Sequence, residues 1–191
     1  MCGIGGVFPR LGVNFPTHNT RRLFCLLQDR GSHASGFAVM YNDMDEPIVV
    51  KDAVASKHLG VKLYDYTVGK PKYVLLHTRY STQGSTSNNG NNHPVIGHNQ
   101  LVTHNGVLAF REDDYIFSEL KNTDNVQRLH TVDTEAINAI LQYRGITELL
   151  ESIQGSMSCA WVDYTNVNEV NLFTNGGNPH VIGETVDGHF V

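Results

Sequence analysis

The sequence predicts an α+β fold in which two β-sheets pack face to face and helices cover the outside. Short apolar segments typical of half-buried strands occur in runs, helical segments are grouped between them, and no regular alternation of strand and helix appears. With 191 residues, of which 40% are hydrophobic, and no repeat or linker, the chain is expected to form one domain over residues 1–191.

The first half of the chain contains four expected strands and one clear helix. A helix is expected over residues 17–30, with Thr17 as its N-cap, Gly31 as its stop and Leu23, Phe24, Leu26 and Leu27 on its apolar face. Two strands separated by a turn rich in Asn and Asp predict a β-hairpin. The expected strands are 2–8, 35–42, 46–52 and 72–82, and 57–68 is weakly helical.

The second half begins with a loop and then repeats the grouping of strands and helices. Ser, Asn, Gly and Pro dominate residues 84–99, which is typical of a loop. Residues 111–121, 133–145 and 146–153 are expected helices, and the apolar residues of the second recur with helical spacing. The expected strands are 100–110, 156–164, 169–175, 180–185 and 189–191.

Composition excludes several classes of function. The net charge is −5 and no basic run occurs, so a nucleic acid is a poor candidate for the partner. No signal peptide and no apolar run of membrane-spanning length is present. The three cysteines lie far apart, which argues against a disulfide framework and favours the cytoplasm. The ten histidines match no metal-binding spacing, so no metal is expected.

Three element ends carry polar groups, each with two open interpretations. Arg79 follows a buried strand, where an arginine pairs either with a structural acid or with a bound carboxylate. Asn105-Gly106 forms either a type I′ turn or a pair of donors for an oxyanion. Asp133 either caps the helix that follows or pairs with a substrate ammonium. Taken singly, each segment favours the structural role.

Cys2 is equally ambiguous when it is considered alone. It is a lipid attachment point, a packed strand residue, or a nucleophile that becomes N-terminal when Met1 is removed. No basic patch or second anchor supports lipidation. The other two thiols, Cys25 and Cys159, lie in apolar segments and are expected to be buried and inert.

The order of short motifs along the chain resembles the class II glutamine amidotransferase domain. MCGIGG, RGSHASG, HTRYSTQGST, THNGVL, VDTE and GSMSCAW follow one another, and the match runs from Cys2 to about Gly183. The resemblance implies the four-layer αββα sandwich of the N-terminal-nucleophile hydrolases. It also implies hydrolysis of the glutamine side-chain amide, without a cofactor.

The resemblance implies a catalytic role for three residues. Removal of Met1 leaves Cys2 with a free α-amine, whose pKa near 7.7–8.0 suits it to accept the thiol proton. The side-chain amide of Asn105 and the N–H of Gly106 then hold the oxyanion, and a γ-glutamyl thioester forms on Cys2. The alternative is a non-catalytic glutamine-binding or scaffold module that retains Met1.

Four further residues match family positions that face the substrate. Arg79 is expected to pair with the glutamine α-carboxylate and Asp133 with its α-ammonium, so that an amino acid is preferred to an isolated amide. Thr82 matches a position that lines the substrate, and Arg30 a position near the Cys2 terminus. An amidohydrolase acting on another amide is disfavoured by Arg79 and Asp133.

The chain departs from the family in two motifs and in its extent. Near the end, TNGGNPHVIG stands where relatives often carry an arginine-containing segment near the acceptor domain. Relatives usually carry an acidic residue and a serine before the glycine of the RG segment, whereas this chain has Ser32-His33-Ala34-Ser35-Gly36. The resemblance therefore does not extend to closure of this loop over glutamine. No ammonia-accepting segment follows residue 191, so a separate synthase subunit is the expected partner, beside a stand-alone glutaminase or a fragment.

Overall fold

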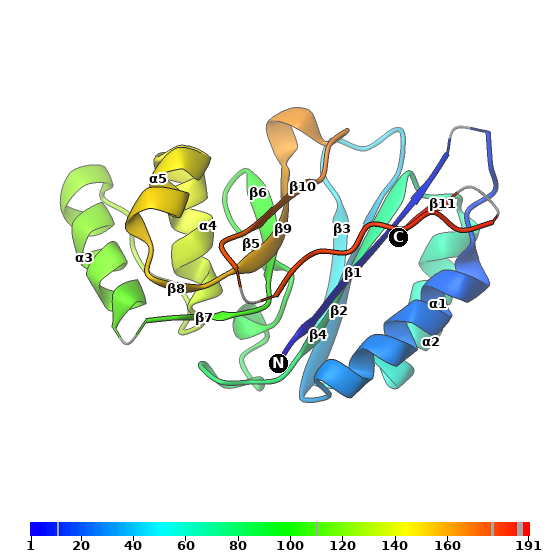
Figure 1. Cartoon of the computed structure of the whole chain (residues 1–191), viewed down its shortest axis with the longest axis horizontal. Coiled ribbons are helices and arrows are strands. Elements are labelled where there is room, and N and C mark those ends of the chain that lie inside the picture. Colours follow the sequence, from blue (N-terminus) through cyan, green and yellow to red (C-terminus); the bar gives the residue numbers. More distant parts are fainter. Residues whose placement is uncertain (11, 110, 177, 187–188) are drawn as a thin grey trace.

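A computed structural model, which describes residues 1–10, 12–109, 111–176, 178–186 and 189–191, shows four layers (Figure 1). Helices α1 (Thr17–Leu27) and α2 (Ser56–Val68) cover one sheet, and α3 (Glu112–Asp124), α4 (Thr134–Tyr143) and α5 (Gly145–Ser152) lie on the far side of the other. The two sheets pack against each other in the middle. The predicted four-layer αββα sandwich is confirmed.

All strand pairs in the described part of the chain are antiparallel. The first sheet contains, in spatial order, β11 (His189–Phe190), β1 (Gly3–Pro9), β4 (Tyr73–Arg79), β2 (Ala34–Met40) and β3 (Ile48–Asp52). The second contains β10 (Asn171–Thr174), β9 (Ser158–Asp163), β6 (Gln100–His104) and β5 (Val95–Ile96). A small third sheet pairs β7 (Val107–Leu108) with β8 (Gly155–Ser156).

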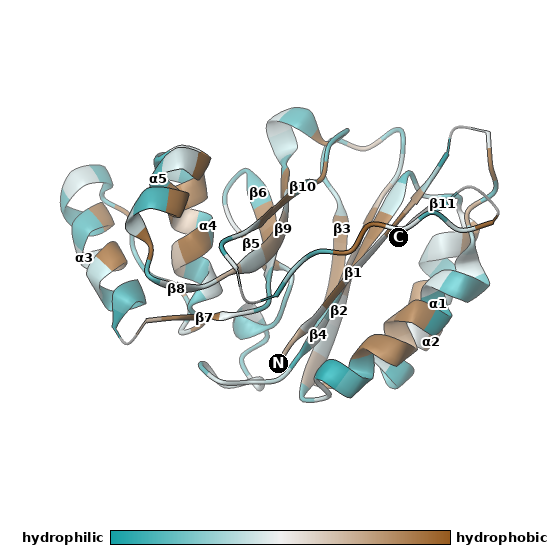
Figure 2. Ribbon diagram, in the orientation of Figure 1, coloured by the Kyte–Doolittle hydropathy of each residue, from teal (hydrophilic) through white to brown (hydrophobic). Residues whose placement is uncertain are grey.

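Buried apolar side chains form three clusters, one in each space between neighbouring layers of the four-layer backbone. Along β4, Val74 and Leu76 pack toward α1 and α2, whereas Tyr73 and Leu75 pack toward the other sheet. This alternation follows from the two-residue period of a strand. Accordingly, the central strands are coloured mainly hydrophobic in Figure 2, and the helices carry both kinds of residue.

The same period directs the polar ends of two strands, β1 and β4, into the space between the sheets. Ile4 and Phe8 of β1 face the second sheet, so Cys2 lies on the same side of the strand. Arg79 shares the face of Tyr73 and Leu75. The strands therefore deliver these residues to one end of the interface between the sheets.

Some predicted boundaries are wrong at the start of the chain. Thr17 is the first helical residue of α1 rather than its N-cap, and its hydroxyl donates to the Thr67 carbonyl at 3.2 Å. Leu26 is 58% exposed, whereas Phe24 is fully buried. A short 3₁₀ turn (Gln28–Arg30) follows α1, and the chain becomes extended at Gly31. The helix in 57–68 and the hairpin of β2 and β3 are confirmed.

In the second half, one predicted strand is divided and one is absent. Residues 100–110 form β6 and β7 with a break at Asn105-Gly106, and Phe110 lies outside the described residues. Residues 180–183 belong to no strand, although 189–190 do. The loop 84–99 contains a 3₁₀ turn (Asn89–Asn91), and another (Tyr164–Asn166) follows β9.

Candidate active site

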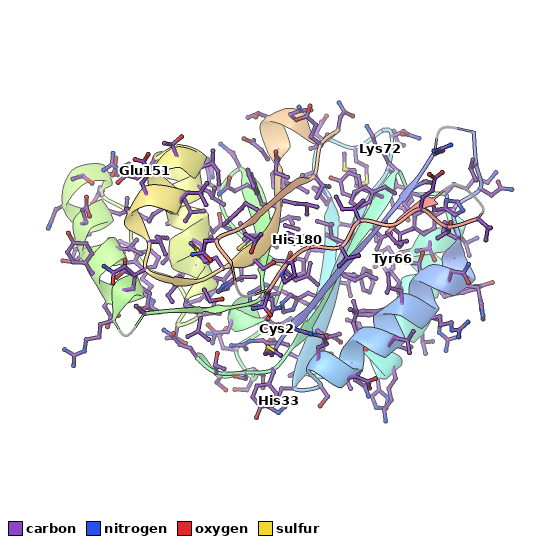
Figure 3. The ribbon with its side chains drawn as sticks, viewed as in Figure 1. Cys2, His33, Tyr66, Lys72, Glu151 and His180 are labelled. Carbon is purple, nitrogen blue, oxygen red and sulfur yellow. The ribbon has the colours of Figure 1, made fainter. Side chains whose placement is uncertain are left out.

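Cys2 lies immediately before β1, at the end of the sandwich where His33 also lies (Figure 3). Its backbone N–H donates to Asn105 Oδ1 at 3.2 Å, which joins the two sheets at this end. Its thiol donates to the carbonyl of Tyr80 at 3.7 Å. Burial raises the pKa of the Cys2 thiol; the positive charge of Arg79 opposes this change, and the negative charge of Asp133 adds to it. The thiol is therefore protonated near neutral pH.

Asn105 and Gly106 lie at the break between β6 and β7. The Asn105 backbone exchanges two hydrogen bonds with Ser158, at 2.9 and 3.1 Å. Neither residue has a positive φ, so the type I′ turn is excluded. A Cβ at Gly106 would lie 1.8 Å from the Ser156 carbonyl oxygen, and a side chain cannot fit there. Because Oδ1 of Asn105 faces Cys2 N, its Nδ2 group remains to donate to a bound molecule.

Arg79 ends β4 as a buried cation with neutral partners. Its guanidinium donates to Asn92 Oδ1 at 3.0 Å, to the Gly84 carbonyl at 2.9 Å and to the Gln83 carbonyl. Among the described residues, no carboxylate lies within ion-pair distance of it. Burial lowers the pKa of this guanidinium. A structural acid is thus missing, and a bound carboxylate would supply the negative charge.

Asp133 occupies the N-cap position of α4 but its side chain makes no capping bond. Oδ2 accepts the N–H of Leu108 at 3.2 Å, and Oδ1 lies 3.8 Å from His104 Nδ1. The residue is 4% exposed. Its carboxylate therefore points away from the helix axis toward β7, where it is available to a cation in the site.

The remaining two candidates lie at the edge of the site. Arg30 is exposed, but its Nε donates to the carbonyl of Cys2 at 3.1 Å and its Nη2 to Met1 Sδ at 3.8 Å. Thr82 is exposed in the loop after β4. The structure thus brings Arg30 to the N-terminus by direct contact, whereas it places Thr82 two residues beyond Tyr80, the residue whose carbonyl accepts from the Cys2 thiol.

Sequence reasoning missed two residues that support Arg79: Asn92, which accepts from its guanidinium, and Lys51, which binds Asn92. Lys51 Nζ donates to the carbonyls of Asn92 and Pro94 at 2.7 and 2.8 Å. Burial lowers the pKa of Lys51 to about 8, and the charge of Arg79 contributes. The composition of residues 84–99 predicts that Asn92 lies in a loop, but it does not predict the partner of its side chain. An isolated asparagine gives no sequence signal of which strand end it meets.

A buried histidine cluster beside the site was also missed. His77 Nε2 donates to the His104 carbonyl at 3.0 Å, and its ring stacks on His93 at 4.1 Å. Thr134 Oγ1 contacts His93 Nε2 at 2.7 Å and His104 Nδ1 at 3.1 Å. Burial lowers the pKa of His77 to about 3 and that of His93 well below its ordinary value. These rings are neutral packing groups.

The described residues show neither a metal-binding cluster nor a membrane-spanning helix. No group of three or more His, Cys, Asp or Glu residues in that part of the chain has an arrangement able to hold a metal ion. None of the helices it contains has the length and apolar character needed to cross a bilayer.

Solved structures of known proteins define the class of this fold. Glutamine phosphoribosylpyrophosphate amidotransferase from B. subtilis, complexed with ADP and GMP, matches with a TM-score of 0.72 and 17% identity over 100% of this chain and 41% of that one. An allosteric regulatory enzyme of purine biosynthesis matches with the same TM-score and 19% identity, again over 100% and 41%. Over its whole length, the chain therefore shares the fold of the matched part of these two enzymes.

The sequence relatives are also enzymes whose names specify glutamine. Glutamine–fructose-6-phosphate aminotransferase (isomerizing) of Buchnera aphidicola subsp. Acyrthosiphon pisum is 26% identical over 201 residues, covering 100% of this chain and 31% of the relative. That of Wigglesworthia glossinidia brevipalpis is 27% identical over 202 residues, covering 96% and 30%. No family model matches. The resemblance to the class II glutamine amidotransferase domain is confirmed, and the chain spans about a third of the length of these relatives.

Proposed function

We propose that the chain hydrolyses the side-chain amide of glutamine to glutamate and ammonia through a thioester on Cys2. The observation that carries the proposal is the meeting of Cys2, Asn105 and two oppositely charged buried groups at one end of the sandwich. The relatives named for glutamine-dependent transfer of an amino group support the choice of substrate.

The first half of the reaction forms the thioester. Removal of Met1 turns Cys2 N into an α-amine, which accepts the thiol proton as Sγ attacks the amide carbonyl. The Asn105 amide and the Gly106 N–H stabilise the oxyanion. The amine passes the proton to the leaving nitrogen, the C–N bond breaks and ammonia departs. Because burial raises the pKa of the thiol, this base is required at neutral pH.

The second half releases glutamate. The same α-amine removes a proton from a water molecule, which attacks the thioester carbonyl, and the C–S bond breaks with return of the proton to sulfur. Throughout, the guanidinium of Arg79 pairs with the α-carboxylate and Asp133 with the α-ammonium. Arg30 orders the cleaved terminus through the Cys2 carbonyl, and Thr82 lines the bound substrate.

Substitution of Cys2 tests the reaction directly. Cys2→Ala removes the nucleophile but leaves the terminus and its base, so glutamate release should fall to the background rate. Cys25→Ala is the matched control, because that thiol lies on α1 and faces α2, on the outer side of the first sheet. A Cys2→Ala protein that releases glutamate at the wild-type rate would exclude the mechanism.

Intact mass distinguishes the enzyme from the non-catalytic alternative. Loss of one methionine exposes the α-amine, whereas retention of Met1 leaves an amide that cannot act as the base. We expect the mass without Met1 in protein that labels with a glutamine-analogue electrophile. Complete retention of Met1 in active protein would contradict the role of the α-amine.

The ammonia is proposed to serve a synthase partner. Free ammonia is protonated and diluted in water, so transfer requires a second active site nearby. Co-purification of the native chain identifies that partner. Three free thiols in the described residues suit work in a reducing cytoplasm.

A further inference from the structure

His33, in the RG segment that departs from the family pattern, contacts three successive residues at the end of β4. Its backbone N–H donates to the Arg79 carbonyl at 3.0 Å. Its ring packs against the Tyr80 ring with centroids 4.6 Å apart. Its Nδ1 accepts the backbone N–H of Ser81 at 3.0 Å. Since a backbone amide can only donate, Nδ1 is unprotonated in this arrangement.

The residues that follow Ser81 turn back and hold the Arg79 side chain. Within the Tyr80–Gly84 loop, Ser81 Oγ donates to the Gly84 carbonyl at 3.0 Å. The carbonyls of Gln83 and Gly84 both accept from the Arg79 guanidinium. The position of that guanidinium therefore depends on the conformation of its own loop.

The two ends of the loop have different anchors. Gln83 Nε2 donates to Asp113 Oδ2 at 2.6 Å, which fixes the far end to α3. At the near end, the loop is fixed by His33 and by Gly31, where a Cβ would lie 2.5 Å from Arg79 C and Tyr80 N. Two side chains bind the loop backbone at this end: Cys2 Sγ donates to the Tyr80 carbonyl at 3.7 Å, and His33 Nδ1 accepts the shorter bond from the Ser81 N–H.

We propose that His33 is a positioning residue for recognition of the substrate α-carboxylate. By accepting the Ser81 N–H, it holds the Tyr80–Gly84 loop in the shape that presents the Arg79 guanidinium to the site. This inference rests on the proposed function for the identity of the substrate. It assigns His33 no contact with the reacting atoms.

Two substitutions of His33 test its hydrogen-bond acceptor and its aromatic ring separately. His33→Phe keeps a ring on Tyr80 and loses the acceptor, whereas His33→Asn loses the ring and keeps an acceptor oxygen near the position of Nδ1. His58→Phe is the matched control, because His58 is an exposed histidine on α2.

Two reagents that alkylate Cys2 provide the readout. 6-Diazo-5-oxo-L-norleucine carries the α-carboxylate that Arg79 would bind, whereas iodoacetamide does not. For His33→Phe we expect labelling by the first reagent to slow about fivefold, as for loss of one hydrogen bond, with labelling by iodoacetamide changed less than about twofold. His33→Asn and His58→Phe should label at close to the wild-type rates. Equal slowing with both reagents, or His33→Asn as slow as His33→Phe, would overturn the proposal.

Hydrogen exchange tests the same bond without any substrate. The Ser81 amide should exchange faster in ligand-free His33→Phe than in the wild type and His33→Asn. Equal exchange in all three would overturn the role of His33. A wild-type protein that 6-diazo-5-oxo-L-norleucine cannot label at Cys2 would instead overturn the proposed function, so the two failures are distinguishable.

Discussion

Asp133 combines the position of a helix cap with the surroundings of a ligand-binding group. Because its carboxylate makes no capping bond and pairs weakly with His104, Asp133→Asn should disturb binding more than folding. We expect the KM for glutamine to rise about 10- to 100-fold, the range for loss of a charge-assisted hydrogen bond. Steady-state glutamate release measures this change.

The same variant should lose its preference for an amino acid. Turnover of glutaramate, the analogue of glutamine without the α-amino group, should change much less in Asp133→Asn, since it has no ammonium to lose. Asp124→Asn is the control, because Asp124 pairs with Arg144 on the outer helices. An equal loss on both substrates would place Asp133 outside ammonium recognition.

His77 should make the stability of the protein sensitive to acid. Burial lowers its folded pKa to about 3, below the ordinary value of 6.5, so the unfolded chain binds the proton first as pH falls. Its contribution is present above pH 6.5 and is lost progressively between pH 6.5 and 3. At pH 5.0 this loss is about 2 kcal/mol relative to pH 7.5.

His77→Gln tests that contribution, because the glutamine amide can donate to the His104 carbonyl but does not titrate. Its free energy of unfolding in urea should fall by about 2 kcal/mol less than that of the wild type between pH 7.5 and 5.0. His58→Gln, at an exposed histidine, should keep the wild-type pH dependence. Identical pH dependence in His77→Gln and wild type would contradict a neutral, buried His77.

At the scale of elements, Gly60 offers a simple test of how α2 packs. A Cβ at Gly60 would meet Arg21, Cys25 and Phe24 of α1 at 3.6 to 3.9 Å, which is ordinary contact distance. Glycine also weakens a helix interior by about 0.5–1 kcal/mol relative to alanine. Gly60→Ala should therefore raise the free energy of unfolding in urea by about that amount, and a destabilised variant would show that α1 and α2 lie closer together.

The elements themselves could mostly be predicted from the sequence, because their apolar periods are local properties. The break between β6 and β7 could not. The apolar residues at both ends of 100–110 predict one strand, but His104 pairs with Cys159 and Val107 with Ser156 in another sheet, so the change of partner is set by distant segments. The break places Asn105 beside Cys2, and local propensity gives no measure of that contact.

The candidate site shows the same division. Arg79, Asn105 and Asp133 were each ambiguous alone, and only the order of the motifs selected the ligand-binding interpretation. Lys51, Asn92 and His33 gave no local signal because their roles depend on which loop packs against them. The bond from the Ser81 N–H to His33 Nδ1 joins two segments far apart in the sequence, so it exists only in the folded protein.

At the scale of the whole molecule, the segment after β10 connects the two sheets (Figure 1). His180 Nε2 contacts the Phe173 carbonyl at 3.1 Å and Ser158 Oγ at 3.2 Å in the second sheet. Further along, Gly183 and Val191 exchange two backbone bonds, and β11 pairs with β1 in the first sheet. We call residues 178–186 the strap, because they lie across one open side of the sandwich.

This strap borders an apolar cavity of about 320 Å³ between the sheets. Phe8 and Leu75 of the first sheet, Ala160 of the second, and Val181 and Ile182 of the strap line it. Val181 and Ile182 are 85% and 69% exposed, so their own packing contributes little to holding the strap. The polar contacts of His180 are therefore expected to hold the strap beside this pocket, which is partly open to solvent.

His180→Ala should release the strap at this point. We expect the free energy of unfolding to fall by about 1 kcal/mol, the value of a lost hydrogen bond, and ANS fluorescence to rise as more of the apolar lining becomes accessible to the dye. His98→Ala, at an exposed histidine on the loop before β6, should change neither quantity. If His180→Ala bound no more ANS than His98→Ala, the strap would be held by β11 and its pairing with β1 rather than by His180.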